Sequence, residues 1–152
     1  MSEQQLTDQQ ILAELFETAA TAPEESVFIK RLGLRVTLNG LTSSRVDSIR
    51  ERCTSKKNVK GMQTEKLDNE LFNSTLIQEA TKGIEVIRNY GEQKEQRLVL
   101  KGWGDERITS QLKLSGGDQA VRRLLLAGEL DAVGDKVLEL SGFGVDIEEV
   151  KN

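Results

Sequence analysis

The fold is decided where the hydrophobic period changes, in residues 27–40, VFIKRLGLRVTLNG. Two short runs rich in β-branched and other apolar residues, 27–29 and 34–38, flank Gly33, and a turn signal follows the second run. Runs of this length bounded by turn residues are typical of paired strands. The stretch therefore predicts a β-hairpin over residues 25–40, which must pack against other elements because a lone hairpin is marginal in water.

Helical spacing dominates on both sides of this hairpin. Apolar residues recur at that spacing from Thr7 to about Ala20, and Thr7 with Gln10 forms a capping box at the start. Four further helices are expected, capped by Thr42, Asp68 and Asp118 or starting after Gly128.

Two segments do not follow this pattern. Residues 55–64 are polar and basic without periodicity, which predicts a mobile loop. Between residues 82 and 114, glycines interrupt two short apolar runs. Runs this short fit either strands or helical turns, so both interpretations stay open there.

A chain of 152 residues is the size of one domain. The predicted class is α+β, a mainly helical single domain with an N-terminal β-hairpin. Its expected parts are an N-terminal helix and linker at 1–24, the hairpin at 25–40, a helical remainder at 41–143 with an uncertain insert at 82–114, and a polar tail at 144–152.

Composition excludes several kinds of chemistry. The chain has no histidine and one cysteine, so it cannot build an imidazole-based triad, a histidine metal site or a multi-cysteine site. Sites of these kinds are therefore excluded, and we expect no catalytic residue, no metal and no cofactor. No apolar run approaches the roughly 18 residues of a membrane span, and the polar start lacks a signal-peptide pattern, so we expect a cytoplasmic protein without membrane contact.

One segment carries a local surplus of positive charge. Its candidate partner-binding residues are Arg45, Arg50, Arg52, Lys56, Lys57 and Lys60. They form either a solvated surface or an electrostatic docking site for an acidic protein partner. Nucleic acid is not expected as a partner, because no aromatic residues interleave with the basic ones and the chain has a net charge of -4.

Two apolar sets near the C-terminus complete the candidate site. They consist of Leu124, Leu125, Leu130, Val133 and Val137. Their helical spacing fits core burial, and it also fits a groove for a partner.

Several sequence blocks, in the same order, resemble one known family. The N-terminal blocks are residues 27–33 and 49–54, the central helix spans 69–81, and the C-terminal blocks are 124–129 and 138–143. Together they resemble the core of the XkdN-like phage tail assembly chaperones.

The resemblance implies a non-enzymatic role in phage or prophage tail assembly. It implies binding to the tape measure protein to keep it soluble, with the tail tube protein and self-association as further possibilities. The protein is then expected in the host bacterial cytoplasm and not in the mature virion. The alternative is a structural tail-completion or tube-associated protein that the virion retains.

Overall fold

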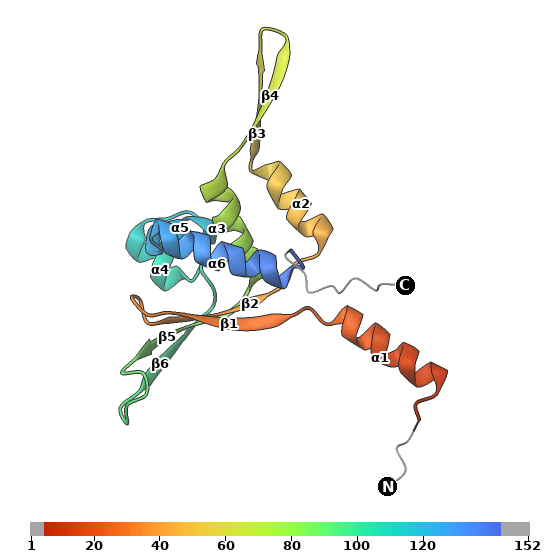
Figure 1. Cartoon of the computed structure of the whole chain (residues 1–152). Helices are drawn as coiled ribbons and strands as arrows, with labels where there is room; N and C mark the ends of the chain where they lie inside the picture. Colours follow the sequence, from red (N-terminus) through yellow and green to blue (C-terminus); the bar gives the residue numbers. More distant parts are fainter. Residues whose placement is uncertain (1–4, 144–152) are drawn as a thin grey trace.

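The computed structural model describes residues 5–143, so the predicted tail at 144–152 lies outside the described part. Pairs of strands are separated by helices along this range, which ends in three consecutive helices (Figure 1). Their order is α1 (Asp8–Ala20), β1 (Glu24–Ile29), β2 (Leu34–Asn39), α2 (Ser43–Arg52), β3 (Thr54–Val59), β4 (Met62–Leu67), α3 (Asn69–Ala80), β5 (Thr81–Arg88), β6 (Gln96–Leu100), α4 (Glu106–Leu112), α5 (Gly117–Leu124) and α6 (Ala127–Leu140).

Four strands form an antiparallel sheet in the order β1-β2-β5-β6. Val36 of β2 lies opposite Val27 of β1 and Ile84 of β5, and Ile84 in turn lies opposite Leu100 of β6. Side chains of a strand alternate between its two faces, and in β2 every second residue is buried. This alternation fixes which face of the sheet meets the core.

Helices α3, α5 and α6 cover that face (Figure 1). Leu38 of β2, Leu76 of α3, Val121 of α5 and Val137 of α6 all have no exposed surface. The predicted hairpin at 25–40 is confirmed, and the packing it needs comes from helices later in the chain.

Between β2 and β5 the chain leaves the sheet and forms a second hairpin. Strands β3 and β4 pair in an uninterrupted register from Thr54 opposite Leu67 to Val59 opposite Met62. This two-stranded sheet projects away from the body of the domain (Figure 1). We call residues 54–67 the arm.

Helix α1 also projects from the body (Figure 1). Its predicted capping box is confirmed, because the Gln10 N–H donates to Thr7 Oγ1 at 3.2 Å and the Thr7 N–H donates to Gln10 Oε1 at 2.9 Å. The helix has no buried residue, and its large apolar side chains, including Phe16, remain exposed.

The predicted fold class is wrong in one respect. The domain is α+β, but its strands are spread through the chain instead of being confined to an N-terminal hairpin. The segment predicted as a mobile loop, 55–64, forms most of the arm, and both ambiguous runs after residue 82 are strands. These segments are strands because their backbones pair with neighbouring strands, and hydrophobic periodicity in the sequence reveals little of such pairing.

Two helix starts near the C-terminus also differ from expectation. Gly116 is the N-cap of α5, which has no side-chain cap, and Asp118 instead pairs with Arg122 one turn later. Helix α6 begins at Ala127, so Gly128 lies inside its first turn. The caps at Thr42 and Asp68 are confirmed by their bonds to backbone N–H groups of the first helical turn.

Candidate partner-binding surfaces

The basic residues predicted as a docking site fall into two groups. The arginines lie on α2 and contact the domain itself. Arg45 and Arg52 both reach Glu79 of α3, at 3.2 and 3.0 Å, and so tie α2 to α3. Arg50 contacts Asp47 at 3.4 Å and stacks over the Phe72 ring at 5.3 Å.

The lysines lie on the arm and are exposed. Lys56 and Lys57 are on β3, and Lys60 is in the turn. With Lys66 on β4, the arm carries four lysines against the single carboxylate of Glu65. None of these lysines forms an ion pair within residues 5–143. The arm therefore presents a net positive surface to solvent.

One face of the arm combines this charge with apolar side chains. In an antiparallel pair, residues directly opposite each other share a face, as do residues two apart on one strand. The register therefore puts Lys57 and Lys66 on the same face as Val59 and Met62. The last two are 54% and 72% exposed, so this face of the arm presents lysine charge and apolar surface together.

Most of the candidate apolar residues are buried. Leu125, Leu130, Val133 and Val137 are at most 6% exposed and belong to the core cluster. Leu124 is half-buried and points to a different environment, a groove at one end of the sheet.

This groove escaped the sequence analysis because its walls come from segments far apart in the chain. Apolar side chains from the β1–β2 turn region, β5, β6, α4 and α5 surround a cavity of about 300 Å³. Arg88 and Arg107 complete the lining. We call it the Arg88–Arg107 groove. Its apolar lining residues belong to separate short runs of the sequence, and nothing in these runs shows that they meet.

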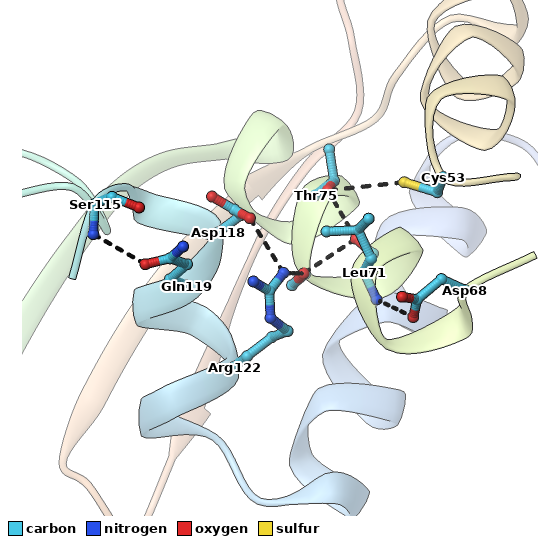
Figure 2. Close-up of polar contacts among 9 residues, drawn as sticks. Cys53, Asp68, Leu71, Thr75, Ser115, Asp118, Gln119 and Arg122 are labelled. Atoms are coloured by element: carbon cyan, nitrogen blue, oxygen red, sulfur yellow. Dashed lines mark hydrogen bonds and ion pairs between the residues drawn. The ribbon is translucent and has the colours of Figure 1, made fainter. Parts of the chain in front are cut away.

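A cluster of polar side chains connects α5 and the end of α2 to α3 (Figure 2). Arg122 Nη1 donates to the buried Ser74 Oγ at 2.9 Å and to Asp118 Oδ2 at 3.1 Å, which joins α5 to α3. The Cys53 thiol faces Thr75 Oγ1 at 4.0 Å, and burial raises the pKa of this thiol. These contacts hold α5 and the end of α2 against α3.

A second charged contact, between Asp105 and Arg107, lies beside the groove at the end of β6. Asp105 is buried, and its carboxylate accepts hydrogen bonds from the Arg107 side chain and from the Lys101 and Arg107 backbone N–H groups, at 2.9 to 3.0 Å. The Arg107 guanidinium, followed by the backbone donors, holds the pKa of this carboxyl well below its usual range. Asp105 thereby fixes the end of β6 and positions Arg107.

Within residues 5–143, no three histidine, cysteine, aspartate or glutamate side chains gather as a metal site would require. The helices of this range are too short or too polar for any of them to cross a bilayer.

The described residues define a class, a small α+β domain with a projecting basic arm and an apolar groove. A family model described as phage XkdN-like tail assembly chaperone protein matches residues 12–152. The chain belongs to this family, which confirms the resemblance seen in its sequence blocks.

One solved structure is also similar. The crystal structure of the protein YqbN aligns with a TM-score of 0.48 and 18% sequence identity, over 83% of this chain and 88% of that chain. None of the curated proteins compared matches the chain.

Proposed function

We propose that this tail assembly chaperone binds the tape measure protein and keeps it soluble until the tail tube encloses it. The observation that carries the proposal is the arm, a projecting hairpin whose lysines have no ion pair within residues 5–143 and whose one face exposes apolar residues. A chaperone that shields an aggregation-prone client needs an accessible surface of mixed character. The tail tube protein is a possible second partner.

The chemistry of the arm predicts the kind of client segment it contacts. The arm lysines, which have no carboxylate partner in the described part of the chain, attract carboxylates and speed encounter, and exposed charges are screened by salt. Val59 and Met62 add apolar contact, and methionine adapts to irregular surfaces. We therefore expect the arm to contact client segments that combine acidic and apolar residues, with an affinity that falls as salt rises.

The first experiment is co-production of the full chain with the tape measure and tail tube proteins encoded beside it. Size-exclusion chromatography with light scattering should detect a soluble complex with the tape measure protein. The tape measure protein produced without the chain should aggregate. If no complex forms and mass spectrometry finds the chain in mature virions, the protein is instead a structural tail component.

Charge variants then test the arm. Lys57→Glu combined with Lys60→Glu should weaken client binding about tenfold at low salt and flatten its salt dependence. The matched control is Lys94→Glu with Lys113→Glu, which makes the same charge change at two exposed lysines away from the arm. An equal loss in both variants would show that net charge, and not the arm, controls binding.

A further inference from the structure

The Arg88–Arg107 groove has an apolar interior that remains partly open. Leu34 and Leu100 form part of its floor and are 5% and 6% exposed, whereas Leu98 on the edge strand β6 is 48% exposed. Val86, Ile108 and Leu124 supply further apolar walls. The groove encloses a cavity of about 300 Å³, which is at the lower end of the volume range of ligand-binding pockets.

Both arginines of the groove are held in place by backbone carbonyls. Arg88 Nη1 donates to the carbonyls of Leu32 and Ile87 at 3.1 and 3.2 Å. Arg107 Nη2 donates to the Val99 carbonyl at 3.2 Å. Guanidinium groups fixed in this way lose little conformational entropy when they bind a further acceptor.

Each guanidinium retains donors for a partner. Arg88 uses only Nη1 in the contacts above and has no carboxylate partner among residues 5–143. Arg107 engages Asp105 through Nε and Nη2, which leaves Nη1 without a bond in the described contacts. No acidic residue lines the groove. Arg107 is ion-paired with Asp105, so among the described residues Arg88 supplies the uncompensated positive charge of the groove, which complements a carboxylate placed beside an apolar surface.

We infer that the groove binds an amphipathic helix of the client whose apolar face is flanked by aspartate or glutamate. The inference rests on the proposed function for the identity of the client, the tape measure protein. Helix-in-groove recognition places apolar anchors at i, i+3 or i+4, and i+7 into the groove. Carboxylates on the neighbouring helical positions then reach Arg88 and the free side of Arg107.

The chain itself offers a rival occupant. Helix α1 exposes an apolar face, and residues 5–26 contain acidic residues but no lysine or arginine. A second copy of the chain could then insert α1 into the groove. The client is the occupant we commit to, because under the proposed function the chain must hold a client segment, and the experiment separates the client from α1.

The probe is a synthetic 18-residue helical peptide with leucines on one face and glutamates beside them, titrated against the full chain by fluorescence anisotropy. A second peptide carries lysine in place of glutamate. The glutamate peptide should bind at least about tenfold more tightly than the lysine peptide. Failure of the glutamate peptide to bind would overturn the inference.

Four variants test whether the peptide binds in the groove. Arg88→Glu should reverse the preference between the two peptides, and Leu98→Ser should weaken both by about tenfold. The controls are Arg35→Glu and Val99→Ser, which introduce the same new side chains on the opposite face of β2 and β6. Equal effects of controls and groove variants would contradict the proposed site.

The same variants separate this inference from the proposed function. A tape measure complex that survives both Arg88→Glu and Leu98→Ser would leave the function standing and overturn the groove as the client site. If the glutamate peptide binds as predicted but the tape measure protein does not bind, the groove still prefers acidic helices, and the identification of the client as the tape measure protein is wrong. If Leu98→Ser instead converts an oligomer to a monomer in light scattering, α1 of a second copy is the occupant, and the client assignment fails.

Discussion

The domain contains two hairpins of equal size that are stabilised in different ways. Strands β1 and β2, like β3 and β4, are six residues long and pair without interruption. In β2 three residues are buried against the helices, whereas neither strand of the arm has a buried residue. The difference lies in what covers the strands, not in how they pair.

The comparison separates two contributions to β structure. Burial of side chains supplies most of the free energy that orders β1–β2, at roughly 25 cal/mol for each Å² of apolar surface removed from water. The arm relies on backbone pairing and on its turn, where Lys60 and Gly61 have φ values of 54° and 80°. Such a hairpin is marginal alone, so it can adapt to a partner at little cost to the rest of the domain.

The largest expected effect comes from removing the same two methyl groups in each hairpin. Val36→Ala leaves a cavity in the fully buried centre of the sheet and should lower the free energy of unfolding by about 2 to 3 kcal/mol. Val59→Ala, on the exposed arm, should change it by less than about 0.5 kcal/mol. Urea denaturation measures both, and similar losses would show that the arm is part of the cooperative core.

An intermediate effect is expected at the third hairpin, β5–β6, whose end is fastened by Asp105. The pKa of this carboxyl is lowered in the folded state by Arg107 and by backbone donors. A lowered folded-state pKa means that the carboxylate stabilises the fold above the unfolded value of about 3.9, and this stabilisation is lost as pH falls below it. Asp105→Asn should therefore destabilise the protein at pH 7, and less so in acid.

Urea titrations of wild type and Asp105→Asn at pH 7, 5 and 3 test this. The gap between the two unfolding free energies should shrink between pH 5 and pH 3. Asp135→Asn is the matched control, because Asp135 is exposed on α6 and should matter little at pH 7. A gap that stays constant with pH would mean that the ionised carboxylate is not the stabilising form.

The smallest effect concerns the turn of the arm. Gly61→Ala introduces a Cβ that meets no atom within 4 Å, so its cost, about 1 kcal/mol, comes from the positive φ alone. Amide hydrogen exchange should become faster in β3 and β4 and stay unchanged in β1 and β2. Gly128→Ala, also in open space but inside helix α6, should instead stabilise slightly.

The sequence predicted elements whose signals are local. Thr7, Thr42 and Asp68 stand where a side-chain oxygen accepts from the first helical turn, and all three caps are confirmed. The arm was missed because its strands are exposed on both faces and therefore lack alternation. Its Lys60-Gly61 turn also differs from the Asn-Gly and Asp-Gly pairs that usually mark such hairpins.

Three consecutive leucines show why the groove could not be predicted. Leu124 lines the groove, Leu125 is 6% exposed in the core, and Leu126 is 58% exposed. Helix α5 ends at Leu124, so helical periodicity no longer assigns the next two residues. Their environments depend on where β6 and α4 lie, which is a property of the tertiary fold. Whether any of the predicted residues binds a partner stays a prediction.

The arm is joined to the body at Cys53, the single cysteine of the chain. Its carbonyl accepts the Asp68 N–H at 2.9 Å, and its thiol is buried with a raised pKa. Alkylating reagents attack the exposed thiolate, so the native protein should react only when the base of the arm opens. The alkylation rate of Cys53 therefore reports how often the base of the arm opens, and a partner that binds the arm should lower this rate.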